Sequence, residues 1–372
     1  MDRAGDNRLS RVQTAALCAF AAAGGLIMWT SQLRGSITTA WPIALVLSAA
    51  VIAVMLLAVG SAFARTGCDT LEELLGKCLS RPVARIIMLL LAVWLAARLA
   101  QILHLQTDMT RQYLLDETPR WVIAATLAVS GLVVMYGGVY GLGRTSELLM
   151  LIALLPLAIM LSAGLLKTDY GELRVLLQPQ LETLPRQITA ALYTFAGAEC
   201  MIFFIGRGKA RQESGKAAAL TVAVAAVIAA VLFVSAVGIL TIDGINANEF
   251  PLVEMARMIN IGGVAMTERF DIVLLVLRTL GVIVQTGILL YCASAGLRGV
   301  FGKGDRRYIS AVLTVVVVIL SQVCFIDGAA RVINAISTAG IYISLLAIIP
   351  ALFIASRFVP KRKEGANEER SS

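Results

Sequence analysis

The chain has 372 residues, of which 58% are hydrophobic and only 15% are charged, and its formal net charge is +8. Soluble domains carry about a quarter of charged residues, so this composition excludes a soluble enzyme and a DNA-binding protein. No Pro/Gly/Ser-rich linker divides the chain, which favours one integral membrane domain. The basic residues are spread over several connections rather than gathered on one face, so nucleic acid is not an expected partner.

Apolar segments of membrane-spanning length follow one another along the chain. Because roughly 20 apolar residues cross a bilayer as a helix, the pattern predicts an all-α integral membrane fold of ten transmembrane helices. The predicted spans are 12–32, 41–63, 83–105, 121–138, 147–166, 187–206, 217–241, 267–292, 308–326 and 332–356.

Three further segments do not span. Residues 69–80 place leucines on one face and read as a short interfacial helix, and a second short helix is expected at 250–259. Residues 357–372 form a basic and then polar tail, which is expected to be disordered. Lys and Arg concentrate in the connections that share a side with the N-terminus, which predicts cytoplasmic N- and C-termini.

A carboxylate interrupts the sixth apolar segment. Glu199 follows Gly197 near the middle of that segment. An ionisable group at such depth is costly, so by default it marks a functional site. Gly197 weakens the helix and lets a ligand approach bare backbone. The pair therefore predicts a broken membrane helix that holds something polar.

Span one carries a matching feature, Gly24 and Gly25, at its middle. Spans one and six each open a set of five, over 12–166 and 187–356, and an odd number per set gives the sets opposite topology. Glycine breaks at matching positions of two inverted repeats mark the midplane site of a transporter. The alternative is that these glycines only allow close helix packing.

Two buried polar stripes also need an explanation. Asp271, Arg278 and Gln285 recur every seven residues, within about 40° on one helical face. Span three has a comparable stripe with Arg98 and Gln101. Because lipid exposure would be costly, both stripes are expected to face the interior. Each arginine then either forms an interhelical ion pair, with Glu199 or Asp271 as acceptor, or binds a ligand carboxylate.

The sequence offers some material for ion or proton coupling. Glu199 is the strongest proton-linked candidate, and Asp271 is a second acidic group at a span end. Thr279 and Thr286 are candidate oxygen donors to a cation site between spans one and eight. The chain has one histidine, His104, and no metal-ligand cysteine spacing, so neither a metal site nor a cofactor nor catalysis is expected.

Phe195, Gly197 and Glu199 form an F-x-G-x-E pattern. It resembles the signature in the sixth helix of the amino acid–polyamine–organocation transporters. More narrowly, the chain resembles the endospore germination permeases, the B subunits of spore germinant receptors. Four further pieces match that family in order, at 9–13, 113–119, 140–149 and 268–271. At Arg278 the chain departs from the family, which usually has tryptophan there.

The resemblance implies a LeuT-like fold of two inverted five-helix repeats with broken helices one and six. It also implies a small germinant such as an amino acid, assembly with A and C receptor subunits, and the inner membrane of the spore. The alternative is a stand-alone proton-coupled amino acid transporter, because the same fold serves both. The residues expected to line the ligand site are Gly24, Gly25, Thr194, Phe195, Gly197 and Glu199, with Arg98, Gln101 and Arg278 nearby.

Overall fold

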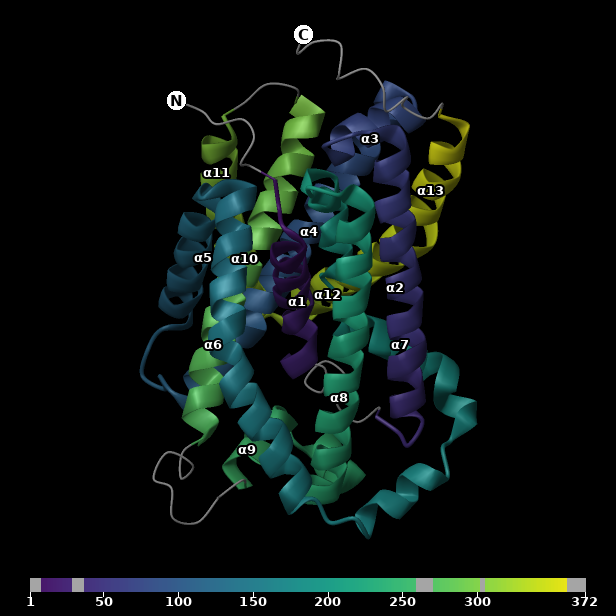
Figure 1. Ribbon diagram of the computed structural model, residues 1–372. Helices are drawn as coiled ribbons and strands as arrows, with labels where there is room; N and C mark the ends of the chain where they lie inside the picture. Colours follow the sequence, from purple (N-terminus) through teal and green to yellow (C-terminus); the bar gives the residue numbers. More distant parts are fainter. Residues whose placement is uncertain (1–7, 29–36, 259–269, 302–304, 360–372) are drawn as a thin grey trace.

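The computed structural model describes residues 8–28, 37–258, 270–301 and 305–359, and these ranges are almost entirely helical. The longest helices run side by side along the molecule, with α3 at one end and α9 at the other (Figure 1). The α-helices are α1 (Arg11–Met28), α2 (Trp41–Thr66), α3 (Leu71–Cys78), α4 (Arg81–Tyr113), α5 (Arg120–Tyr136), α6 (Gly138–Lys167), α7 (Leu184–Thr194), α8 (Arg211–Ala247), α9 (Pro251–Met258), α10 (Phe270–Phe301), α11 (Arg306–Val323), α12 (Asp327–Ile343) and α13 (Ile349–Phe358).

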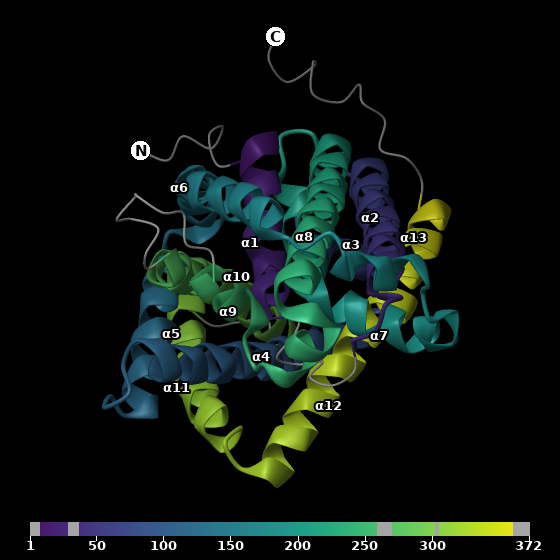
Figure 2. The same ribbon diagram turned by 90° about the horizontal axis from the view of Figure 1, so that it is seen from below.

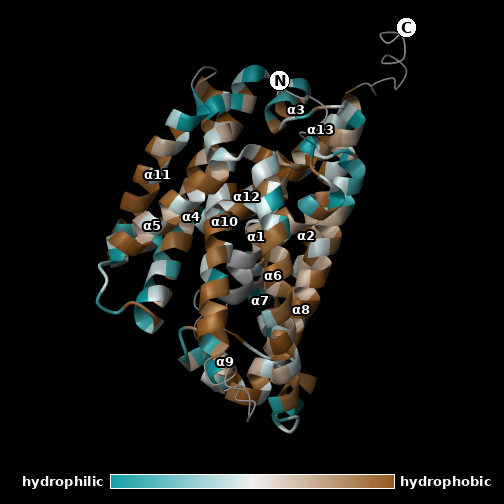
Figure 3. Ribbon diagram, turned by 60° about the vertical axis from the view of Figure 1, so that its left-hand side comes forward, coloured by the Kyte–Doolittle hydropathy of each residue, from teal (hydrophilic) through white to brown (hydrophobic). Residues whose placement is uncertain are grey.

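Helices of membrane-spanning character account for most of the described residues. Seven segments there are long and apolar enough to cross a bilayer, and α5 is a shorter apolar helix. Together with α1 and the broken segment that starts with α7, they provide a helical counterpart for each of the ten predicted spans. Hydrophilic residues gather toward the ends and hydrophobic residues between them, as expected for a bilayer-embedded bundle (Figure 3).

Several helices extend beyond the predicted spans. Helix α6 begins at Gly138, nine residues before the expected start at 147, and α4 continues to Tyr113, eight residues past 105. Gly138 has a φ of 66°, a left-handed conformation that turns the chain between α5 and α6 without a loop. Hydropathy reports only the apolar part of a helix, so it misses polar ends that reach the headgroup region.

The two predicted short helices are confirmed as α3 and α9. The side chain of Thr70 accepts a hydrogen bond from the backbone N–H of Glu73 at 3.2 Å and begins α3. Leu71, Leu74 and Leu75 are buried on the inner face of α3. The amphipathic pattern therefore gives a helix that packs against the bundle on one side.

Span one differs from the prediction. Helix α1 runs unbroken through Gly24 and Gly25 to Met28, so the expected break does not occur at these glycines. Glycine is tolerated there because, away from water, the helical hydrogen bonds have no competitor. Residues 29–36 lie outside the described residues. In Figure 2, α1 lies among α6, α8 and α10, and it packs against all three.

The last predicted span, 332–356, comprises α12 and α13 joined by a π-helical turn at Ser344–Ile348. In the same view α11 and α12 diverge into a V beside the rest of the bundle (Figure 2). The predicted tail lies largely outside the described residues, because these end at 359.

Close packing of α2 against α8 is the most extensive helix contact among the described residues. Gly60 and Gly215 meet at this crossing, and a Cβ atom on Gly215 would lie 2.8 Å from the Cα of Gly60. Small residues at a membrane helix crossing let the two backbones approach each other.

We expect Gly215→Ala to lower the unfolding temperature of the purified protein, because the added methyl group would force α2 and α8 apart. Overpacking of this kind reduces the free energy of unfolding by about 1–3 kcal/mol. Gly76→Ala on the exposed face of α3 is the matched control, since its new Cβ meets nothing within 4 Å. Equal unfolding temperatures for the two variants would contradict this account of the crossing.

Candidate functional site

Span six is interrupted where the sequence predicts. Helix α7 ends at Thr194, and the chain resumes in two 3₁₀ segments, η3 (Ala198–Phe203) and η4 (Ile205–Arg207). Gly197 at the junction has a φ of 115°, which favours glycine. A Cβ at this position would also overlap the carbonyl oxygen of Ala21 in α1. Glycine is therefore required twice, by the backbone conformation and by the approach to α1.

Glu199 lies in the first turn of η3 and is only 2% exposed. Its Oε2 accepts a hydrogen bond from the backbone N–H of Gly197 at 2.9 Å, so the carboxylate caps the new helical segment. Its Oε1 has no hydrogen-bond partner among the described residues, and neither has the hydroxyl of Thr194. A buried polar atom without a partner is unfavourable, so such atoms beside a helix break indicate a place for a polar ligand.

Arg98 of α4 brings a positive charge to the same region. The guanidinium is buried, and its central carbon lies 4.2 Å from the centroid of the Tyr193 ring at the end of α7. Its Nη1 donates to Oε1 of Gln101 at 3.1 Å, whereas its Nε has no hydrogen-bond partner in the described part of the chain. The charge of Arg98 acts electrostatically on Glu199, although no ion pair within 4 Å joins these two described residues.

A hydrogen-bond network fixes Arg98 from the other side. Gln101 donates to Asn334 of α12 at 2.6 Å, and the hydroxyl of Tyr193 donates to Gln101. The Tyr193 hydroxyl also lies 3.3 Å from the hydroxyl of Ser337. The network joins α4, α7 and α12 around one arginine. Tyr193, Asn334 and Ser337 are members of the site that were not identified from the sequence. Asn334 and Ser337 are polar residues three positions apart in an apolar span, and this spacing indicates a shared helix face.

Helix α10 contributes the opposite wall. Nε2 of Gln285 donates at 2.8 Å to the carbonyl oxygen of Ala21, the group against which Gly197 is pressed, while Oε1 of Gln285 has no partner among the described residues. Arg278 lies two turns away and is buried, and the charge of Arg98 acts on it. Both polar stripes predicted to face the interior are therefore buried.

The expectation for Asp271 as an acceptor for the buried arginines is corrected by its contacts. Its Oδ2 lies 3.4 Å from Nε of Arg257 in α9, and Arg257 in turn contacts Glu254 and the ring of Tyr113. Asp271 lies in the first turn of α10, so about two helical turns separate it from Arg278. It joins an ion-pair cluster at the α9 end of the bundle rather than the group around Glu199.

The proposed cation site between spans one and eight also does not match the structure. A Cβ on Gly131 of α5 would overlap the side chain of Thr286, so Thr286 faces α5. The hydroxyl of Thr279 donates to Leu275 at 2.9 Å and accepts from Gln106 of α4 at 3.1 Å. Seven-residue spacing puts both threonines on one face of α10, and that face contacts α4 and α5 instead of α1.

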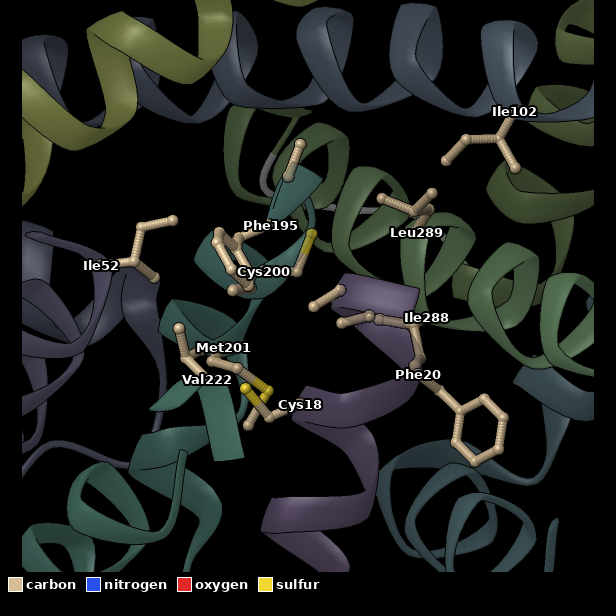
Figure 4. Packing of buried hydrophobic residues seen from close by; sticks show 14 of the residues in the cluster. Cys18, Phe20, Ile52, Ile102, Phe195, Cys200, Met201, Val222, Ile288 and Leu289 are labelled. Carbon is tan, nitrogen blue, oxygen red and sulfur yellow. The ribbon is translucent and has the colours of Figure 1, made fainter. Parts of the chain in front are cut away.

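Apolar packing surrounds the inner half of span six. Phe195, Cys200 and Met201 lie among side chains of α1 and α10, with Cys18 and Ile288 close by (Figure 4). Cys292 donates a weak hydrogen bond from its sulfur to the carbonyl oxygen of Cys200 at 3.9 Å. Such surroundings strengthen electrostatic interactions and make each unpaired polar atom of the site more costly.

Two solved structures have a similar fold. The fold matches MhsT in complex with L-phenylalanine with a TM-score of 0.67 and 15% identity, over 93% of this chain and 95% of that one. It also matches Mhp1, a nucleobase-cation-symport-1 family transporter with bromovinylhydantoin bound, with a TM-score of 0.59 and 13% identity, over 96% and 95%. The fold is thus the LeuT-like inverted repeat, as the sequence predicts.

Relatives by sequence are germination proteins of Bacillus subtilis (strain 168). Spore germination protein A2 is 24% identical over 237 residues, 64% of this chain and 65% of the relative. Spore germination protein YndE is 25% identical over 210 residues, 56% and 57% respectively. The chain thus aligns with less than two thirds of the length of either relative. A family described as spore germination protein, the spore permeases, matches residues 8–326. The chain belongs to this family of germination-related membrane permeases.

Proposed function

We propose that the chain is the membrane subunit of a spore germinant receptor, which binds a small germinant at the break in span six. The observation that carries the proposal is the buried carboxylate of Glu199, with one oxygen capping the break and the other unpartnered among the described residues. This oxygen can accept a hydrogen bond from a ligand, and that bond would remove the free-energy cost of burying an unpaired polar atom.

The opposite charges around the break favour an amino acid as the germinant. Arg98 offers a planar guanidinium, whose geometry suits a carboxylate. Glu199 offers Oε1 to an ammonium group, and Thr194 adds a hydroxyl. We therefore assign the ligand carboxylate to Arg98 and the ligand amine to Glu199. Gln101 supports Arg98 by a hydrogen bond, Arg278 is a second buried cation on which the charge of Arg98 acts, and Gly24 and Gly25 lie in α1.

The broken span offers a route from binding to signalling. The inner half of span six ends at η4, where Leu9 accepts a hydrogen bond from the N–H of Lys209 at 3.0 Å and donates its own N–H to Arg207 at 3.1 Å. Ligand occupancy that shifts η3 would change this link and so the face presented to A and C receptor subunits. We place both termini in the cytoplasm and the protein in the inner membrane of the spore.

The alternative function is a stand-alone proton-coupled amino acid transporter. The similarity of the fold to MhsT, a structure with L-phenylalanine bound, favours it. In that case Glu199 would carry the coupled proton. Against a cation-coupled mechanism, Thr279 and Thr286 face α4 and α5, and Asp271 is paired with Arg257.

Glu199→Ala and Gly25→Leu are expected to abolish the germination response of spores while the protein still accumulates in their membrane. The first variant removes the ligand's acceptor, and the second replaces a glycine that the site is proposed to include with a bulky residue. The response is measured as the rate of spore germination, and the accumulation of each variant in the membrane is measured by immunoblot. Glu72→Ala on the exposed face of α3 is the control, and unaltered responses in both test variants would refute the assignment.

Arg98→Gln should weaken binding of an activating amino acid by about 10- to 100-fold, since a charge-assisted hydrogen bond contributes about 1.5–3 kcal/mol. Ligand-induced thermal stabilisation of the purified protein measures it. The corresponding amine without a carboxylate should bind wild type and Arg98→Gln equally weakly. If the amine also loses affinity in the variant, Arg98 supports the fold of the site rather than contacting the carboxylate.

Uptake into liposomes separates the sensor from the transporter. With an inward proton gradient, purified protein should not concentrate a radiolabelled amino acid that it binds, because a sensor needs only a shift between conformations. Uptake that exceeds the external concentration, and that Glu199→Gln abolishes, would establish the transporter instead.

A further inference from the structure

A charged pocket lies away from the broken span, where α4 ends and α5 begins. It has a volume of about 400 Å³ and is lined by Asp108, Arg111, Gln112, Asp116 and Arg120. In Figure 3 the connection between α4 and α5 is a hydrophilic loop beside a largely hydrophobic helix. Two cations and two anions share this pocket, so it suits a ligand that carries both charges.

Contacts within the chain hold these groups in place. Nε of Arg111 donates to the backbone carbonyl of Asp116 at 3.2 Å, and one carboxylate oxygen of Asp116 accepts the N–H of Glu117 at 3.0 Å. The guanidinium of Arg120 lies 4.1 Å from the ring centroid of Phe325 in the connection after α11. The pocket is therefore built by three segments rather than by the freely moving tips of surface side chains.

Arg120 and Asp108 form only a long and partly exposed ion pair. Arg120 and Asp108 approach only to 3.9 Å, too long for a hydrogen bond, and their side chains are 42% and 34% exposed. An external anion can therefore reach the arginines, and an external ammonium can reach Asp108, without breaking a hydrogen bond between these two residues.

The rim of the pocket points to a membrane lipid as the occupant. Leu114, Leu115 and Trp121 are 37%, 46% and 61% exposed beside the charged residues. Tryptophan at a helix end is typical of the level of lipid headgroups. Val129 and Val133 continue the exposed apolar face along α5. A ligand at this position would have its charges in the pocket and its apolar part along this face.

We propose that this pocket binds the headgroup of an amine-bearing zwitterionic phospholipid, with its phosphate on Arg111 and Arg120 and its primary ammonium on Asp108 and Asp116. A free amino acid has comparable charges, but it would gain nothing from the apolar rim. The site is separate from the Glu199 site, so it stands whether or not the germinant proposal holds.

Native mass spectrometry of the full-length protein, titrated with single lipids, tests the proposal. Phosphatidylethanolamine should bind more tightly than phosphatidylcholine, whose quaternary ammonium donates no N–H, and than phosphatidylglycerol, which lacks the cation. Asp108→Asn should reduce the ratio of the affinities for phosphatidylethanolamine and phosphatidylcholine by about three- to fivefold, which is the contribution of a partly exposed charge pair. Arg111→Gln should weaken the binding of all three lipids, because each of them carries the phosphate.

Glu172→Gln and Arg174→Gln are the matched controls, because both residues are exposed in the 3₁₀ segment η1 (Glu172–Leu177), outside the pocket. They should leave lipid preference unchanged. The proposal is overturned if Asp108→Asn retains the full preference, or if glycine or alanine at millimolar concentration displaces the lipid, which would make the pocket an amino acid site.

Discussion

The carbonyl oxygen of Ala21 occupies the space that a side chain at residue 197 would need. This contact brings the backbone of span one against the break of span six, and Gln285 of α10 holds the same oxygen by a 2.8 Å hydrogen bond. Three spans from both halves of the chain therefore meet at one peptide group. The left-handed φ of Gly197 turns the chain at that point, and Glu199 then caps the segment that follows.

The polar groups around the break are incompletely satisfied. Burying a polar atom without a partner costs about 1–3 kcal/mol, and Glu199, Arg98, Thr194 and Gln285 each contain such an atom within the described residues. Next to these groups, the described polar network from Gln101 to Asn334 and Tyr193 is well connected. Other described buried polar atoms without a partner, such as those of Gln106 and Ser235, are spread through the bundle, so these groups distinguish the break only in combination with the interrupted helix.

Much of this arrangement follows from the sequence, because the bilayer imposes length and polarity on each span. The ten spans, the break at Gly197 and the burial of Glu199, Arg98 and Arg278 were all predictable from apolar runs and the cost of charge in lipid. The partners of these residues were not. Which face of α10 meets α5 depends on helix rotation, and that rotation is set by packing at glycines such as Gly131. Likewise, Asp271 pairs with an arginine of α9, a helix whose position hydropathy does not specify.

Photo-crosslinking tests most directly whether the germinant binds at this break. An amino acid that triggers germination and carries a photoreactive side chain would be activated by light in the presence of the full-length protein, and adducts would be located by mass spectrometry. The account predicts adducts between Tyr193 and Cys200 and near Arg98 of α4, lost on competition with the unlabelled germinant. Competable adducts found only elsewhere, for example in α9 or η1, would contradict it.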